Sequence, residues 1–217
     1  DTLGQEGLPE LEATTNSLTL SLTRDTREPY FDPKRGSFNL FSLERAGGVL
    51  GGSNSFNRFI ADWSFFLRVR RSATVAVRLK EGYTTTFGRT TPDKVSSDER
   101  FELGGANSLR GYEEASVGPI DPFTQKQSGI IMTNVNLEFR FSLPLVKNLD
   151  AGYFLDSGGM WLKRKEVRIE DLRWGAGLGL RWIIPYLGPL RFDWAWKLTP
   201  EEQEERWKWY LAFGHAF

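Results

Sequence analysis

Long segments in which apolar and polar residues alternate one by one are the feature that most constrains the fold of this chain. The clearest segment runs from 190 to 198, where the apolar positions are Leu190, Phe192, Trp194, Trp196 and Leu198. Successive side chains of a β-strand point to opposite faces, so a period of two predicts a strand with one apolar and one polar face.

The same alternation recurs along the chain and predicts an all-β, antiparallel protein of about nine strands. Four further clear rows cover 59–69, 135–143, 174–184 and 209–217. Shorter or noisier strands are predicted near 17–24, 35–46, 73–85 and 149–160. Most of these segments have about ten residues or more, which is longer than the five or six that are usual in globular sheets.

The aromatic residues distinguish two folds that such strands can form. A soluble sandwich would turn its apolar faces inward, whereas a transmembrane β-barrel turns them toward lipid and carries aromatic girdles at both edges of the apolar band. Trp174 and Trp182 bracket one predicted strand, and Trp209 and Phe217 bracket another. The pattern therefore favours an antiparallel transmembrane β-barrel, with the soluble sandwich as the alternative.

The connections between the predicted strands alternate in length, as they do in outer-membrane barrels, which have short periplasmic turns and long outer loops. The short connections lie near 70–73, 144–148 and 185–189, and the long ones near 46–56, 86–130, 162–172 and 199–206. Bacterial barrels of one chain have an even number of strands. Nine strands therefore predict the C-terminal part of a larger barrel. If one of the weaker strand predictions is wrong, the alternative is a closed barrel of eight strands. No signal peptide precedes the strands, which predicts a processed chain or a piece of a longer one.

Composition argues against several classes of function. Lys and Arg number 28, and so do Asp and Glu, so no excess of positive charge favours nucleic acid as a partner. The chain has no cysteine and a single histidine, His215, which excludes thiolate or multi-histidine metal sites and makes a His-based catalytic site improbable. The paired acids at 98–99 and 113–114 are interpreted as solvated loop charge. We therefore expect no enzyme activity, no metal and no cofactor.

Three glycines at alternate positions of one predicted strand face the polar side. Gly175, Gly177 and Gly179 superficially match a dinucleotide-binding loop, but they lie inside a strand with no following helix. Glycine at alternate inward positions instead leaves space for something packed against the barrel wall.

The segment 86–130 is the best candidate to occupy that space, because a loop of this length is usually functional. Its centre contains several glycines and Arg110, the only charged residue between Glu102 and Glu113. If the loop folds into the barrel interior, Arg110 needs a carboxylate partner there, and its planar guanidinium suits bidentate pairing. The inward-facing candidates are Glu138 and Asp156. An ordinary arginine of an outer loop is the alternative that the residues alone leave open.

A set of motifs in consistent order resembles the BamA-type outer-membrane assembly superfamily. The run GGANSLRGY at 104–112 resembles the tip of the sixth outer loop in that family, including Gly111 and Tyr112. The other matches are DTR at 25–27 with FDPKRG at 31–36, LEF at 137–139, FLDSG at 154–158, LGPL at 187–190 and FGHAF at 213–217. Each match alone is weak, but six in family order from about residue 17 to 217 are a specific signal.

The resemblance implies a sixteen-stranded barrel of which this chain, as one domain over 1–217, supplies the last nine strands. Arg110 would contact Glu138 and Asp156 and lock the loop of 86–130 in the lumen. Gly214 would be the flexible point of the final strand, and Phe213 and Phe217 would belong to the strand that forms one side of a lateral seam.

The implied function is insertion of outer-membrane proteins at that seam, in the outer membrane of a Gram-negative bacterium or of an organelle of bacterial descent. The expected partners are the lipid bilayer, unfolded outer-membrane protein clients and periplasmic accessory proteins. The alternatives are a secretion-pore relative and a small stand-alone barrel that acts as a passive pore or structural protein.

Overall fold

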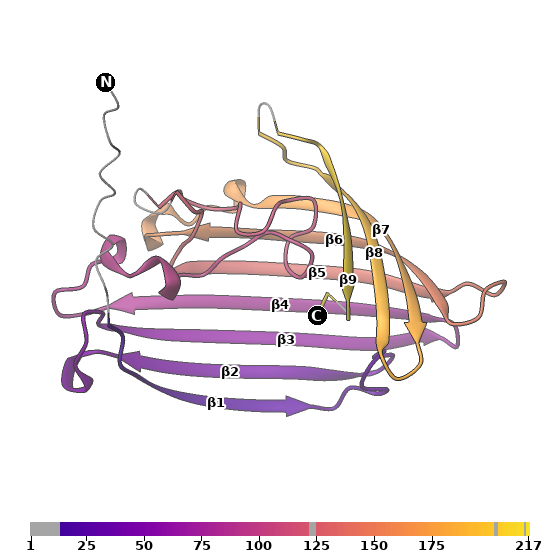
Figure 1. Ribbon diagram of the computed structural model, residues 1–217, viewed down its shortest axis with the longest axis horizontal. Coiled ribbons are helices and arrows are strands. Elements are labelled where there is room, and N and C mark those ends of the chain that lie inside the picture. The colour runs from indigo at the N-terminus through magenta and orange to yellow at the C-terminus, as the bar shows by residue number, and fades with distance from the viewer. Residues whose placement is uncertain (1–13, 122–124, 202–203, 215) are drawn as a thin grey trace, which may run out of the picture.

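The computed structural model describes residues 14–121, 125–201, 204–214 and 216–217. It contains one antiparallel sheet in which every strand pairs with its neighbours in the chain, in the order β1 to β9 (Figure 1). The strands are β1 (Ser17–Asp25), β2 (Gly36–Ala46), β3 (Phe56–Arg70), β4 (Ala73–Thr86), β5 (Ile131–Ser142), β6 (Leu149–Trp161), β7 (Arg173–Ile184), β8 (Gly188–Lys197) and β9 (Trp207–Phe213). The nine antiparallel strands predicted from alternation are thus confirmed.

Among the described residues, helical structure is limited to single turns of 3-10 helix in the connections. These turns are Gly48–Leu50, Pro92–Lys94, Ser97–Glu99, Arg164–Glu166 and Ile169–Asp171. In the part of the chain that the structure describes, no helix is long and apolar enough to cross a membrane.

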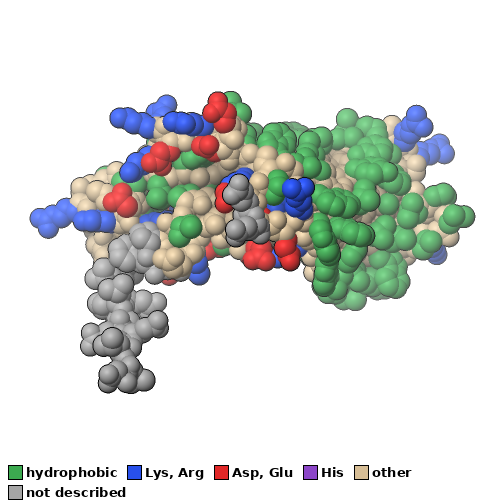
Figure 2. Space-filling model, turned by 90° about the horizontal axis from the view of Figure 1, so that it is seen from above, with side chains coloured by type: hydrophobic (Ala, Val, Ile, Leu, Met, Phe, Trp, Pro, Cys, Tyr) green, Lys and Arg blue, Asp and Glu red, His purple; other side chains and the backbone are tan. Residues whose placement is uncertain are grey.

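The sheet is curved and therefore has an outer and an inner face. Apolar side chains lie on the outer face, and polar and charged side chains lie on the inner face. Apolar side chains on the outer face are exposed, and they include Trp174, Trp182 and Trp209 at 37%, 55% and 57% exposure. Figure 2 shows hydrophobic side chains gathered over one part of this surface, with most Lys and Arg side chains at the two ends. The described residues form no second sheet against the apolar face, which argues against the soluble sandwich.

The inner face carries polar and charged residues that are nonetheless buried. Asp156, Arg191 and Asp193 have no measurable exposure, and Glu138 and Arg140 are 1% exposed. What covers them is the connection between β4 and β5, residues 87–130, which lies on the concave side of the sheet over β5 and β6 (Figure 1). Part of this connection packs through an apolar cluster of Leu103, Leu109, Tyr112, Val117 and Met160.

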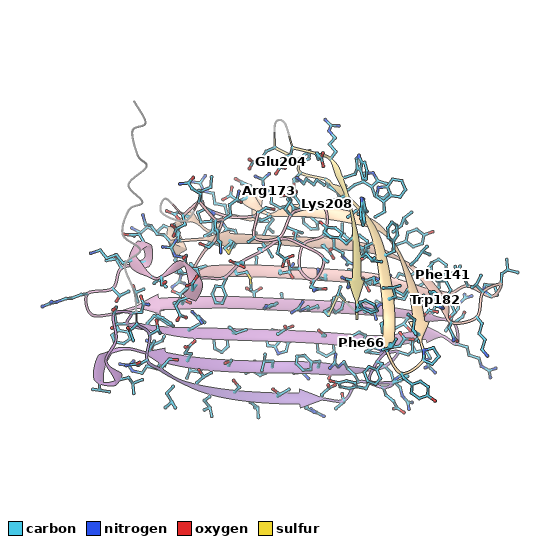
Figure 3. The ribbon with its side chains drawn as sticks, in the orientation of Figure 1. Phe66, Phe141, Arg173, Trp182, Glu204 and Lys208 are labelled. Atoms are coloured by element: carbon cyan, nitrogen blue, oxygen red, sulfur yellow. The ribbon has the colours of Figure 1, made fainter. Side chains whose placement is uncertain are left out.

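The connections are short at one end of the strands, apart from the β1–β2 connection at 26–35, and long at the other end, as the sequence predicts. Trp182 and Phe141 lie at the end where the turns are short, whereas Arg173 lies toward the end with the long connections (Figure 3). In the described part of the chain, β9 pairs only with β8, and β1 only with β2. Both outermost strands therefore have one edge without a partner strand.

The C-terminal strand is shorter than predicted. β9 ends at Phe213, not at Phe217, and Gly214 follows the strand with a φ of +87°, a conformation that favours glycine. The chain then turns to the inner face, where the ring of Phe217 lies 6.2 Å from that of Phe66. The prediction that Phe217 ends the strand on the lipid-facing side is wrong, because the alternation does not continue through Gly214. His215 lies outside the described residues.

Candidate functional site

Arg110, at the tip of the 87–130 connection, is a charged group with no measurable exposure. Its Nε and Nη2 donate hydrogen bonds to the two carboxylate oxygens of Asp156 on β6, at 2.7 and 2.8 Å. The Arg110 backbone N–H donates a third bond to Asp156 at 3.1 Å. Nη1 donates to Glu138 Oε1 on β5 at 2.5 Å, and the guanidinium lies 3.6 Å from the ring centroid of Phe154. The structure therefore brings together the three residues that the sequence singled out, and Asp156 is paired bidentately.

Further charged side chains of the sheet surround Arg110 and its two carboxylate partners. Glu138 also accepts hydrogen bonds from Arg140 Nε at 2.6 Å and Arg181 Nη2 at 2.5 Å. Asp193 lies 3.5 Å from Arg110 Nη1 and 2.8 Å from Arg191 Nε. We call these seven residues the Arg110 cluster: Arg110, Glu138, Arg140, Asp156, Arg181, Arg191 and Asp193. Pairing four arginines with three carboxylates offsets part of the cost of burying these charges.

The loop tip is also held to the sheet through its backbone. Asn136 on β5 donates a hydrogen bond to the carbonyl oxygen of Ser108 at 2.5 Å. Arg191 on β8 donates to the carbonyl of Ala106 at 2.7 Å, and Arg78 on β4 donates to that of Asn107 at 3.1 Å. Side chains of three strands thus satisfy backbone acceptors that the loop would otherwise bury unpaired.

The glycines of β7 lie where this loop and its partners need space. A Cβ atom at Gly175 would overlap the carbonyl oxygen of Arg110. One at Gly179 would meet Asp193 and Arg181 of the cluster. A residue with a side chain at either position would therefore displace the loop tip or its partners.

Two residues beyond Arg110 connect the loop tip to the last strand. The backbone N–H of Gly111 donates to the hydroxyl of Tyr210 on β9 at 3.0 Å, and that hydroxyl donates to the carbonyl of Tyr112 at 2.6 Å. Lys208 on β9 forms an ion pair with Glu113 at 2.6 Å. This hydrogen bond lowers the pKa of the Glu113 carboxyl. The tip thus contacts the wall on one side and the C-terminal strand on the other.

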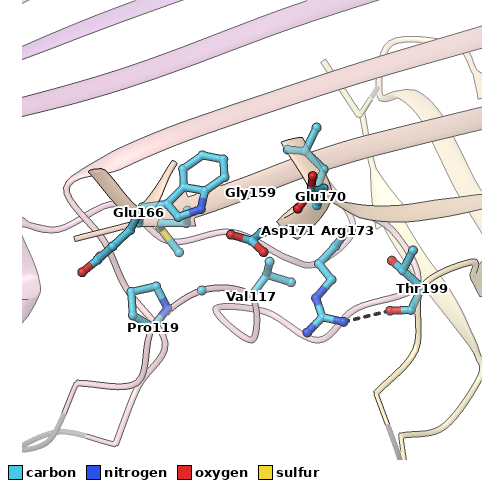
Figure 4. A pocket seen from close by; sticks show the side chains of 12 residues that line it. Val117, Pro119, Gly159, Glu166, Glu170, Asp171, Arg173 and Thr199 are labelled. Carbon is cyan, nitrogen blue, oxygen red and sulfur yellow. Dashed lines mark hydrogen bonds between the residues drawn. The ribbon is translucent and has the colours of Figure 1, made fainter. Parts of the chain in front are cut away.

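A pocket of about 490 Å³ lies beside the loop at the end with the long connections (Figure 4). Val117 and Pro119 line one side, and Arg173 donates a hydrogen bond to the carbonyl oxygen of Thr199 at 3.0 Å. The same carbonyl accepts a bond from the hydroxyl of Tyr112, whose pKa is raised by burial. Among the described residues no group of His, Cys, Asp and Glu has the arrangement of a metal site.

Sequence reasoning did not identify the remaining partners of the cluster or the contacts to β9. Arg140, Arg181, Arg191 and Asp193 lie on the inward side of their strands by simple alternation, which was the available signal. Their position along the barrel axis depends on strand register, for example Arg181 opposite Arg191 and Asp193 opposite Tyr210. Alternation assigns a face but gives no register.

Comparison with known proteins now defines the class to which this architecture belongs. Residues 9–217 match the family model of the Omp85 superfamily domain. The chain belongs to the Omp85 superfamily.

Individual relatives agree with this assignment. The outer-membrane protein assembly factor BamA of Nitratidesulfovibrio vulgaris is 30% identical over 186 residues, which are 85% of this chain and 23% of that protein. The outer-membrane transporter CdiB of an Escherichia coli strain is 26% identical over 138 residues, 60% of this chain and 22% of the transporter. The chain spans less than a third of the length of these relatives.

The solved structures show the same fold. The crystal structure of BamA from Haemophilus ducreyi lacking POTRA domains 1–3 superposes with a TM-score of 0.73 at 22% identity, over 89% of this chain and 41% of that one. The predicted fold, an antiparallel transmembrane β-barrel of which this chain forms a part, is therefore confirmed. So is its location in an outer membrane. Because the named relatives are assembly factors and transporters, the family supports the expectation that the chain is not an enzyme.

The outer face provides a first prediction. Leu178 lies in the middle of β7, is 46% exposed and faces lipid in this fold. Leu178→Arg is expected to lower the free energy of unfolding by about 2–4 kcal/mol, because an arginine near the bilayer midplane is poorly solvated. Urea unfolding in liposomes measures this effect. Val146→Arg, in the exposed β5–β6 turn, is the control and should change stability little; equal effects would contradict a lipid-facing β7.

Proposed function

We propose that this chain is the membrane-inserted part of a BamA-like insertase, in which the free edge of β9 receives strands of unfolded outer-membrane proteins. The proposal rests chiefly on one observation: β9 is the shortest of the described strands and is ended by Gly214 at a positive φ, in a family whose members include outer-membrane protein assembly factors. In the full barrel that edge would form one side of a lateral seam.

The physical driving force is the backbone of the edge strand. Unpaired N–H and C=O groups cost several kcal/mol each in hydrocarbon, so a seam that is weakly closed can accept a new partner strand. A client strand that pairs with β9 by β-augmentation satisfies its own backbone groups at the same time. Insertion by this route requires no covalent chemistry and no nucleotide hydrolysis.

The Arg110 cluster would determine which part of the barrel opens. It fastens the loop tip to β5 and β6, which lie in the continuous part of the sheet, through bonds of 2.5–2.8 Å that are excluded from water. A wall stiffened in this way would leave the seam as the part of the barrel that yields. The clamp role of Arg110, Gly111, Tyr112, Glu138 and Asp156 is part of this proposal.

Gly214 and the residues after it would keep the edge strand short. Because Gly214 turns the chain inward, the segment at 216–217 packs on the inner face and does not extend the edge of β9. Phe217 also lies near Arg140, with 5.6 Å between the guanidinium carbon and the ring centroid. A shorter β9 would form fewer hydrogen bonds across the seam, which favours opening.

Substitution at Gly214 tests this function. A residue with a Cβ disfavours positive φ by about 1–2 kcal/mol, so Gly214→Val should favour a straight and longer β9. We expect insertion of a urea-unfolded outer-membrane barrel protein into liposomes that contain the intact protein to slow by roughly fivefold or more.

The matched control is Gly88→Val in the β4–β5 connection. Gly88 also has a positive φ, and a Cβ there, as at Gly214, would meet nothing within 4 Å. The two variants therefore carry similar strain at different places. Equal rates for both variants, or no acceleration of client insertion by the parent protein over empty liposomes, would reject the proposal.

Secretion is the second candidate function, because the chain also matches the transporter CdiB. A secretion pore would pass its substrate through the lumen and would require the 87–130 connection to leave the inner face. Release of soluble substrate across the bilayer, without insertion of barrel clients, would favour this alternative.

A further inference from the structure

The Tyr210 hydroxyl is placed between two backbone groups of the loop tip. It accepts a hydrogen bond from the N–H of Gly111 at 3.0 Å and donates one to the carbonyl of Tyr112 at 2.6 Å. Both partners belong to the backbone, so their positions are fixed by the fold of the tip. Tyr210 itself lies in the middle of β9, opposite Asp193 in the β8–β9 register.

A second contact comes from the residue two positions before Tyr210, on the same face of β9. Lys208, also on the inward side of β9, pairs with Glu113 at 2.6 Å. Lys208 and Tyr210 thus hold three consecutive loop residues, 111 to 113, against the inner side of the same strand. β9 is the shortest of the described strands, with seven residues, and it shares with β1 the property of having a single partner strand among those described.

We infer that Tyr210 is a positioning residue that fastens the edge strand to the loop tip from inside the barrel. Through Arg110, which immediately precedes these contacts, β9 is connected to β5 and β6 without passing through the sheet. Movement of β9 away from the loop tip has to break the two Tyr210 hydrogen bonds. The loop tip therefore sets how readily the edge strand is released, and this regulation rests on the proposed function of β9 as the seam strand.

The inference predicts a local effect of Tyr210→Phe. The variant keeps the ring and removes only the hydroxyl, which leaves the Gly111 N–H and the Tyr112 carbonyl without this partner. Removing a hydrogen-bonding group that leaves buried partners unsatisfied changes an opening equilibrium by roughly 5- to 30-fold. We expect amide hydrogen exchange of residues 208–213 to accelerate by that factor in the intact protein in lipid nanodiscs, with exchange in β5 and β6 unchanged.

Tyr153→Phe is the matched control, because Tyr153 is 58% exposed on the outer face of β6. Lys208→Gln provides a second variant that removes the other contact and should accelerate exchange of the same β9 amides by a smaller factor. Comparable exchange of β9 in the Tyr210 and Tyr153 variants would overturn the inference, and so would acceleration that is equal in β5, β6 and β9.

The exchange measurement contains no client protein, so its result is independent of the proposed function. A Tyr210→Phe variant with accelerated β9 exchange in a protein that inserts no clients would reject the insertase proposal and retain the loop–strand connection. Unchanged exchange in a protein that does insert clients would reject only the connection.

Discussion

Replacing Arg110 with alanine is expected to lower the free energy of unfolding by about 3–5 kcal/mol, the range for breaking a buried ion pair by removing one partner. Asp156 would retain only the hydrogen bonds from Asn136, at 2.9 Å, and from the backbone N–H of residue 110, at 3.1 Å, and would remain a buried carboxylate without a cation. Glu138 would keep Arg140 and Arg181, so most of the loss comes from Asp156. Urea unfolding in liposomes, followed by the heat-dependent shift in gel mobility, measures the change.

Arg89→Ala is the appropriate control for this prediction. Arg89 belongs to the same 87–130 connection but is exposed, and its removal should change the free energy of unfolding by no more than about 0.5 kcal/mol. Arg110→Lys should fall between the two, because lysine keeps the charge but cannot form the bidentate pair. Similar losses for the alanine variants at Arg110 and Arg89 would contradict a clamp.

Gly175→Val is expected to have a comparable effect without removing any charged group. Its Cβ would overlap the carbonyl oxygen of Arg110, so the loop tip has to withdraw from β7 and its ion pairs lengthen. Overpacking costs typically 1–3 kcal/mol, and the loss of a buried ion pair brings the expected total to about 3–5 kcal/mol. The same unfolding assay applies, combined with proteolysis of the loop, which should become faster when the tip is displaced.

The neighbouring substitution Ala176→Val separates this steric effect from a change of strand propensity. Ala176 is on the outer side of β7, where the two added methyl groups meet lipid rather than the loop. It should leave both unfolding and loop proteolysis close to those of the parent protein. If Gly175→Val behaves like Ala176→Val, the loop tip does not occupy the position described.

The strands could be predicted from the sequence because their alternation has a physical cause that is local. Each residue of β8 from Leu190 to Lys197 faces either lipid or the enclosed interior, and the alternating polarity of the side chains indicates which face each one occupies. The same reasoning assigned Glu138 and Asp156 to the inner face. It was wrong at Phe217, because a period of two holds only while the chain stays extended, and Gly214 ends that conformation.

The contacts of the loop tip could not be derived from local pattern. Arg110 lies 46 residues from Asp156 in the chain. The alternation does not determine at which position along the strands the loop tip contacts the inner face of the sheet. Alternation gave Glu138 and Asp156 as candidate partners and the family resemblance selected the pairing, whereas Asp193 and Tyr210 were missed because no local signal identified their partners. Register within the sheet, which depends on pairing across strands, is the information that alternation lacks.

The most direct test of the account is cross-linking between the edge strand and an inserting client. A cysteine at Leu211, on the outer side of β9, should form a disulfide with a cysteine in the terminal strand of a barrel client that is stalled during insertion. A cysteine at Leu137, on the outer side of β5, should form none under the same conditions. Cross-links of equal yield at both positions, or at Leu137 alone, would contradict the proposal that clients pair with β9.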